Sequence, residues 1–461
     1  MTPRRLALTL FLIPLMGARC HGDDTGPVPE TGNPPDWEPA SAVIVTVHPT
    51  IGSMLVVDWD LHEACEAQVA YRFDDEDWAT SPDVSREAGA HEQILVGIPY
   101  AREVEIQLEL DCAQGPWTSH SVQAETEPLP DGLPHGGLIS AVDGAWDPSW
   151  AFILTSIDSR DDAARPDDTW TVILDRAGRT VWALPTESFR ITLAPRVAVD
   201  GASLLVDLDS FWAIFDAGEA SQVLRVDLEG REIERFDTPG LHHPFTELPD
   251  GSIAWGAAAG MTETIELLSP EGDQTTLWSC YGFHQQVGSM QPCSANTLNW
   301  SEQRGSYLIS FFSTDTVVEV DGDSGENLRW FGHLPGSYAF EPEDSAFFWQ
   351  HGTVFTDAGT LLVSTLNGEP GDESLVREYS LDDDSAVLEQ IWTFGAGEGI
   401  YGYEMGEAWR LPNGNTMHNT GTAQRLREIT PDGQVVWDLG WSRGSYIGRS
   451  EGIEDLYGLL P

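Results

Sequence analysis

Short apolar runs alternate with turn signals along almost the whole chain. Between residues 37 and 128 the runs are SAVIVTVHP, SMLVVDWDL, AQVAYRFDD, HEQILVGIP, EVEIQLELDC and SHSVQAETEP. Every second residue is apolar in most of them, and Gly, Pro or Asp separates one run from the next, which is the pattern of half-buried β-strands. The pattern predicts a small β-sandwich over residues 37–128, followed by the linker PLPDGLP at 128–134.

From about residue 135 to 461 one pattern recurs: a β-run, a turn with Asp or Gly, and a second β-run that usually ends in an aromatic residue. The instances lie at 172–182, 223–236, 265–278, 317–331, 376–394 and 426–439. Most follow another hairpin, such as VAVDGASLLV, ELPDGSIAW, VFTDAGTLLV or RLPNGNTMHN. Four strands per unit at a period of roughly fifty residues indicate a β-propeller. Six copies predict six blades, and the whole chain is expected to be all-β.

The composition restricts the partners. The formal net charge is −52, the isoelectric point is near 4.2, and no lysine is present, so the side-chain cations apart from histidine are all arginine. Nucleic-acid binding requires a basic surface, so we do not expect this chain to bind nucleic acid. The same field repels anions at long range. An anionic substrate would therefore have to be held by local groups.

The N-terminus has the pattern of an export signal. Arg4 and Arg5 precede the apolar run LALTLFLIPLMGA, which is too short to span a membrane. Cys20 follows, and residues 21–36 form a polar, Pro- and Gly-rich tether. Residues 1–20 resemble a bacterial lipoprotein signal with Cys20 as the lipid-bearing residue, although Arg19 replaces the usual small residue. The prediction is an exported cell-envelope protein, anchored by lipid alone in the periplasm or at the outer surface; the alternative is an ordinary secretory signal.

The remaining four cysteines fit an oxidising compartment. Cys65 and Cys112 lie in the first predicted unit, and Cys280 and Cys293 lie together in the second. Neither pair has the close spacing that metal sites favour. We therefore predict two structural disulfides, Cys65–Cys112 and Cys280–Cys293, and no metal site.

Candidate channel residues precede the predicted inner strands. His351 stands in FFWQHGTVFTDAGTLLVST at 347–365, just before a β-run. His242 and His243 precede the ELPDGSIAW hairpin, and Asn296 stands at the matching point of the next unit. Since inner strands of a propeller surround a central channel, we expect these side chains to converge. Each has a structural alternative: the histidines as packed turn residues, and Asn296 as a strand cap.

The order of these segments resembles that of the bacterial arylsulfate sulfotransferase family. The likeness covers about 138–461 and is carried by HHPFTELPDGSI, NTLNWSEQRGSYLIS, TVVEVDGDSGENLRWFG, FFWQHGTVFTDAGTLLVSTLNG, VREYSLDDD and RLPNGNTMHNTGTAQRLREITPDGQVVWDLG. The predicted sandwich looks like a fibronectin type III domain, a similarity that implies no function.

The resemblance implies that His351 is a nucleophile that takes the sulfuryl group from an aryl sulfate and passes it to a phenolic acceptor. His242 or His243 and Asn296 would bind the sulfate, with no cofactor required. Two family residues are replaced, a histidine by Ser294 and an arginine by Phe312. The alternative is therefore a catalytically degenerate propeller that serves as an envelope binding module. A third possibility is a hydrolase that delivers the sulfuryl group to water.

Overall fold

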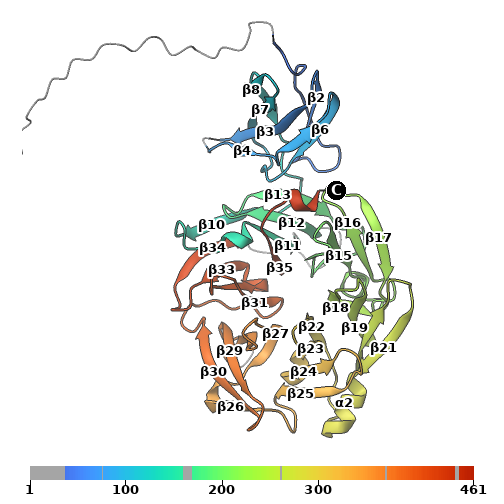
Figure 1. Cartoon of the computed structure of the whole chain (residues 1–461). Coiled ribbons are helices and arrows are strands. Elements are labelled where there is room, and N and C mark those ends of the chain that lie inside the picture. Colours follow the sequence, from blue (N-terminus) through green and yellow to red (C-terminus); the bar gives the residue numbers. More distant parts are fainter. Residues whose placement is uncertain are drawn as a thin grey trace, which may run out of the picture.

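The computed structural model describes residues 37–74, 76–158, 169–259, 262–368, 371–441 and 446–460. The chain is all-β, as predicted: a sandwich precedes a ring of six blades (Figure 1). The predicted signal at 1–20, its Cys20 and the tether at 21–36 lie outside the described residues.

Two sheets form the sandwich. One has the order β1–β2–β6, and the other has the order β4–β3–β7–β8 with β5 beside β3 and β9 beside β7. The strands are β1 (Ile44–Val47), β2 (Leu55–Leu61), β3 (Cys65–Phe73), β4 (Ala79–Thr80), β5 (Val84–Arg86), β6 (Gly89–Leu95), β7 (Glu103–Cys112), β8 (Gly115–Thr118) and β9 (Val122–Glu125). Buried and accessible positions alternate along β7 because one face covers the core. The predicted disulfide Cys65–Cys112 joins directly paired positions of β3 and β7.

The six blades follow one another around the ring. Their strands are β11 (Phe152–Asp158), β12 (Thr169–Asp175) and β13 (Thr180–Pro185) with β35 (Ile447–Ile453) in blade 1; β14 (Arg196–Val197), β15 (Leu204–Leu208), β16 (Gln222–Val226) and β17 (Glu232–Asp237) in blade 2; β18 (Leu241–Glu247), β19 (Ile253–Ala259), β20 (Thr262–Leu268) and β21 (Gln274–Ser279) in blade 3; β22 (Ala295–Ser301), β23 (Ser306–Phe311), β24 (Thr316–Asp321) and β25 (Asn327–Gly332) in blade 4; β27 (Phe348–Phe355), β28 (Leu361–Leu366), β29 (Ser374–Asp382) and β30 (Val387–Phe394) with β26 (Ala339–Glu341) in blade 5; and β31 (Gly406–Arg410), β32 (Thr416–Thr420), β33 (Arg425–Ile429) and β34 (Val435–Trp441) with β10 (Gly136–Ala141) in blade 6.

Both ends of the propeller segment close the ring. β35 pairs antiparallel with β11 and becomes the innermost strand of blade 1. β10 pairs antiparallel with β34 at the outer edge of blade 6. Each of these two blades is therefore completed by a strand from the other end of the propeller segment, and one of these strands, β35, borders the channel.

Burial explains the two kinds of hydrophobic pattern. Strands in the middle of blades, such as β15 and β28, are buried at every position because neighbouring blades cover both faces. The outer strand β17 is accessible throughout its length. Continuous apolar runs thus mark the middle strands, and mixed runs mark the rim.

The recurrent tryptophans link neighbouring blades. Trp182 donates its indole N–H to the Leu228 carbonyl at 2.7 Å, and Trp437 donates to the Arg176 carbonyl at 2.7 Å. Each bond runs from the last strand of one blade to a turn in the next. Trp392 makes an equivalent bond to the Pro431 carbonyl of the following blade. Trp278 donates to the side-chain oxygen of Asn327 on β25 of the following blade, and Trp330 bonds its own loop.

The sandwich rests on blades 1 and 2 (Figure 1). Ile51, Met54 and Val96 belong to one apolar cluster with propeller residues such as Leu154 and Leu204. This shared core indicates a fixed seating of one unit on the other rather than a flexible tether between them.

Helices are short in the described part of the chain: α1 (Phe211–Ile214) and α2 (Cys280–Val287), with 3-10 turns η1 (Pro148–Trp150), η2 (Phe312–Thr314), η3 (Glu343–Ser345), η4 (Gly421–Ala423) and η5 (Tyr457–Leu459). None of the helices in this part is long and apolar enough to cross a membrane. The predicted disulfide Cys280–Cys293 ties the start of α2 to the segment before β22. Two disulfides are compatible with an exported protein.

Trp437 provides a test of inter-blade packing. Its side chain is fully buried, so Trp437→Ala should lower the free energy of unfolding by about 3–5 kcal/mol. Trp437→Phe keeps most of the ring but removes the bond to the Arg176 carbonyl and should cost less. Urea unfolding followed by fluorescence measures both, with the exposed Phe215→Ala as control. A loss no larger than that of the control would contradict the packing role.

Candidate functional site

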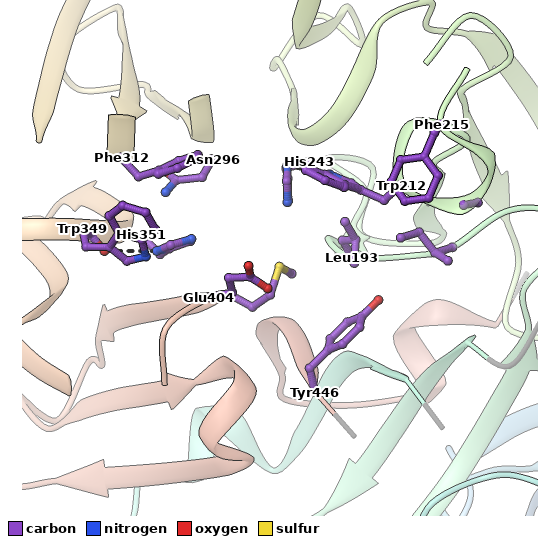
Figure 2. A pocket seen from close by; sticks show the side chains of 13 residues that line it. Leu193, Trp212, Phe215, His243, Asn296, Phe312, Trp349, His351, Glu404 and Tyr446 are labelled. Carbon is purple, nitrogen blue, oxygen red and sulfur yellow. Dashed lines mark hydrogen bonds between the residues drawn. The ribbon is translucent and has the colours of Figure 1, made fainter. Parts of the chain in front are cut away.

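A cavity of about 460 Å³ opens at one mouth of the central channel (Figure 2). It is lined by Ile191, Leu193, Trp212, Ala213, Phe215, His243, Asn296, Phe312, Trp349, His351, Glu404, Met405 and Tyr446. Three of the sequence-predicted residues are among them: His243 on β18, Asn296 on β22 and His351 on β27. The cavity therefore brings together side chains from the inner strands of blades 3, 4 and 5.

The strand register is irregular at each of these three positions. Pairing shifts between Leu241 and Phe245 on β18, between Ala295 and Thr297 on β22, and on both sides of His351 on β27. Such bulges change the direction of a side chain without ending the strand. The same local device thus turns His243, Asn296 and His351 toward the channel.

His351 is held by its neighbours on β27. Gln350 is fully buried, and its amide nitrogen lies 3.1 Å from the Ser310 hydroxyl and 3.0 Å from the Phe311 carbonyl of blade 4. Gly352 has φ +62°, and a Cβ there would overlap Glu407 of blade 6. Gln350 is held by hydrogen bonds to blade 4, and Gly352 packs closely against blade 6. His351, which lies between them, faces the cavity.

The hydrogen bonding of His351 suits a nucleophile. Its Nδ1 lies 3.2 Å from the Trp349 carbonyl oxygen. A carbonyl can only accept, so Nδ1 carries the hydrogen and Nε2 keeps its lone pair. The ring stacks on Phe312 at a centroid distance of 6.1 Å and an interplanar angle of 12°. Burial lowers the pKa of His351 to about 4, which keeps the imidazole neutral near pH 7.

Asn296 lines the cavity and also makes a hydrogen bond between two blades. It is largely buried and lines the cavity, and its amide nitrogen donates to the Gln350 carbonyl at 2.7 Å. The bond joins blade 4 to blade 5 beside His351. Asn296 therefore fixes the geometry of the wall from which it faces the channel.

The two adjacent histidines have different positions. His243 lines the cavity, whereas His242 is buried behind it, with Nε2 at 3.0 Å from a Glu263 carboxylate oxygen. The two Nδ1 atoms are 3.0 Å apart. Burial alone would lower the pKa of His242, but the nearby Glu263 carboxylate outweighs it and raises the pKa. Of the two predicted substrate-binding histidines, only His243 can contact a molecule in the cavity.

The contacts of His243 also determine which of its ring nitrogens carries the hydrogen. Burial, then the charges of His242, His351 and Arg449, hold the pKa of His243 well below its usual value. The Trp212 indole Nε1, whose hydrogen can only be donated, lies 3.3 Å from Nδ1 of His243, so this nitrogen accepts. The hydrogen of His243 is then on Nε2, which makes that atom a donor.

Arg449 is a site residue that the sequence patterns did not single out. Together with His243, Asn296 and His351 it lines a recess of about 10 Å³ that adjoins the cavity. The recess lies deeper along the channel, because it also contacts Gly352, which follows His351 on β27. Its volume is close to the space of one water-sized group.

The guanidinium of Arg449 is only partly satisfied. Nε donates to a Glu407 carboxylate oxygen at 3.0 Å, and Nη2 donates to the Asn299 side-chain oxygen at 3.3 Å. Nη1 is buried and has no hydrogen-bond partner among the described residues. An unpaired donor on a buried cation is costly in free energy, and such groups commonly mark places that receive a ligand.

The two positions at which the sequence departs from the sulfotransferase pattern, Phe312 and Ser294, lie in different places. Phe312 lies on the cavity wall against His351 and Trp349, so an aromatic side chain occupies a site-facing position. Ser294 is not among the residues that line the cavity or the recess; its backbone N–H donates to the Ser313 hydroxyl at 3.1 Å.

Other residues that line the cavity could not be predicted from the sequence pattern. Glu404 and Tyr446 come from connecting segments and Trp212 from the short helix α1, none of which the strand pattern predicts. His284, His333 and His418, for which no role was predicted, do not line the cavity.

One cluster has the composition of a metal site in the described part of the chain. Donor atoms of Cys280, His284 and Cys293 lie within 4.8 Å of one another. Both sulfur atoms are bonded to each other in the disulfide, so neither is a thiolate, the form that binds metals.

No protein-family model and no curated protein matches the chain. Several solved structures do. A protein of unknown function from Bacteroides caccae has 18% identity and a TM-score of 0.43, over 63% of this chain and 93% of that one. Virginiamycin B lyase from Staphylococcus aureus has 8% identity and a TM-score of 0.39, over 69% and 100%. A quinoprotein alcohol dehydrogenase-like protein from Bacteroides thetaiotaomicron has 10% identity and a TM-score of 0.38, over 88% and 95%. Such low values assign no activity to this chain.

The neutral state of His351 is directly measurable. Its ring signals should stay unshifted from pH 8 to pH 5 in an NMR titration, since its pKa lies at about 4 against an ordinary 6.5. The unfolded chain binds this proton below 6.5 and the folded chain only near 4, so His351 should also lower stability as pH falls through that window. His351→Asn assigns the signal and should flatten the acid loss of stability. A midpoint near 6.5 would contradict the burial argument.

Proposed function

We propose that the chain is a sulfuryl transferase that moves the SO₃ group of an aryl sulfate to a phenolic acceptor through His351. The likeness to arylsulfate sulfotransferases in the order of its motifs supports this proposal. The observation that carries it is the convergence of a neutral histidine, two neutral donors and one incompletely paired guanidinium at the cavity and its adjoining recess. Phe312 of blade 4 stands where the resemblance expects an arginine. Arg449 of blade 1 is proposed to supply the positive charge in its place.

In the first step the Nε2 lone pair of His351 attacks the sulfur atom of the ester. An N–S bond forms as the S–O bond to the aryl group breaks, and the phenoxide leaves with the electron pair. The product is a zwitterionic sulfohistidine, a cationic imidazolium ring that carries SO₃⁻, and its Nδ1–H is held by the Trp349 carbonyl. The attack needs no prior deprotonation, because the nucleophilic nitrogen carries no hydrogen.

The non-bridging oxygens of the sulfuryl group need fixed donors. The Nε2–H of His243, the amide of Asn296 and Nη1 of Arg449 are the groups proposed to supply them. The recess has room for one oxygen atom beside Arg449. Local donors of this kind are necessary because the net charge of −52 repels an approaching anion.

In the second step a phenolic acceptor replaces the first phenol. Its oxygen attacks sulfur, the O–S bond forms, the N–S bond breaks and the electron pair returns to Nε2 of His351. The phenolic proton leaves to a base or to water. The sulfuryl group is thereby transferred twice with His351 regenerated.

The second candidate is the binding module without turnover. It is favoured by Phe312, which places an aromatic ring against His351 where a catalytic cation is expected. In that case the cavity would hold an aromatic ligand with His351 as a wall residue. Water as the sulfuryl acceptor remains a variant of the leading proposal.

We further propose that the protein is anchored to the cell envelope through a lipid on Cys20. The support is the sequence pattern at residues 1–20. Cys20→Ser should release the protein from the membrane fraction and remove its acyl mass, with Cys65→Ser as the cysteine control. Retention of Cys20→Ser in the membrane would contradict the anchor.

The covalent step predicts an adduct. Brief incubation with 4-nitrophenyl sulfate and no acceptor, at neutral to alkaline pH, should add about 80 Da to the intact protein. His351→Ala should show neither the mass gain nor nitrophenol release. If the wild-type protein forms no adduct and releases no nitrophenol, the transferase proposal is contradicted and the binding module is favoured.

The role of Arg449 predicts a separate loss. Arg449→Gln should lower kcat/KM for 4-nitrophenyl sulfate by about 10²–10³-fold, since it removes a charged donor at the developing charge. Arg449→Lys keeps the charge and should recover part of the activity. Arg231→Gln, on the exposed surface of blade 2, is the matched control. Equal activity of Arg449→Gln and the control, at unchanged melting temperature, would rule out the assigned role.

A further inference from the structure

Glu404 is the carboxylate among the residues that line the cavity, and within the described part of the chain no side chain is paired with it. It lines the cavity, and Figure 2 shows it reaching into the space between His351 and Tyr446. Among the described residues no hydrogen bond or ion pair engages its side chain. Arg449, the arginine that lines the recess within the described ranges, is paired with Glu407. A carboxylate in this position is complementary to a cation on a bound molecule.

The backbone holds Glu404 in place. Its N–H donates to the Thr422 hydroxyl at 3.3 Å, and its carbonyl accepts from the Thr422 N–H at 3.1 Å. Gly421 has φ +55°, and a Cβ there would overlap the Glu404 carbonyl. The carboxylate is thus carried on a segment fixed against η4 rather than on a free loop end.

Aromatic side chains surround the same space. Trp212, Phe312, Trp349 and Tyr446 line the cavity with Glu404, and Phe215 lies 77% exposed at its entrance. The faces of aromatic rings attract cations, most strongly where water is partly excluded. Burial raises the pKa of Glu404, and a bound cation offsets that cost by stabilising the ionised form.

The two ends of the site therefore have opposite preferences. The recess presents Arg449, His243 and Asn296, which suit an anion, and the cavity presents Glu404 with aromatic rings. We propose that the cavity selects aromatic molecules that bear an ammonium group, placed against Glu404 while the ring lies between the aromatic walls. This inference deepens the proposed function by naming its substrate class: phenols and aryl sulfates with a cationic amino side chain. The negative field of the whole protein attracts such molecules.

Two phenols of nearly equal shape test the charge preference. The probes are 4-(2-aminoethyl)phenol, which carries an ammonium group, and 4-(2-hydroxyethyl)phenol, which is neutral. Binding to His351→Ala, measured by calorimetry, reports affinity without turnover. We expect about tenfold tighter binding of the amine, the effect of one favourable charged contact. Glu404→Gln in the same background should abolish the difference. Glu454→Gln removes one exposed charge elsewhere and is the control for the global field.

The same pair, used as acceptors with 4-nitrophenyl sulfate, separates this inference from the proposed function. A higher kcat/KM for the amine supports both. Turnover with equal kcat/KM, together with equal affinities, overturns the substrate class while the transferase stands. Preferential binding of the amine without any sulfuryl transfer supports Glu404 as a site for cations and overturns the proposed transferase activity. A preference that survives in Glu404→Gln also overturns the inference, since the field of other carboxylates would then explain it.

Discussion

Closure of the ring is the constraint on which the rest of the structure depends. Blades pack face to face, so the first and last blades of an open array would each expose an apolar sheet face, and the ring must close to cover both. Here β35 pairs with β11 on the inside of blade 1, and β10 pairs with β34 on the outside of blade 6. The inner of these two seams also supplies the channel with Arg449. Stability and the chemistry of the cavity therefore share one strand.

The fold could be predicted from the sequence to a large extent because its local signals agree. Apolar runs of strand length, turn residues between them and a recurrent aromatic ending all have the same period, so six blades follow without knowledge of contacts. The tryptophan positions identify surfaces between blades for the same reason, and Trp437 is the clearest example. The cysteine pairs also followed from their placement within each unit.

The site could be predicted only in part. His351 and Asn296 stand at corresponding points of successive blades, which is enough to bring them to one channel. The choice between His242 and His243 was beyond a strand pattern, because alternation is interrupted by a bulge and neighbouring residues exchange faces. Arg449 was missed because its place depends on which strand completes blade 1, a long-range pairing with no local signature. Glu404 comes from a connecting segment, whose path is set by tertiary contacts.

All six blades contribute to the cavity or its recess, from Arg449 in blade 1 and Trp212 in blade 2 to Glu404 before β31 of blade 6. Blades otherwise contact mainly their two neighbours. A ligand that spans the channel adds a connection between blades on opposite sides of the ring, where the bond from Arg449 of blade 1 to Asn299 of blade 4 already makes one. By mass action, any such ligand that binds only the folded ring raises its melting temperature as its concentration exceeds the dissociation constant. Occupancy and resistance to heat are in this way coupled across the whole propeller.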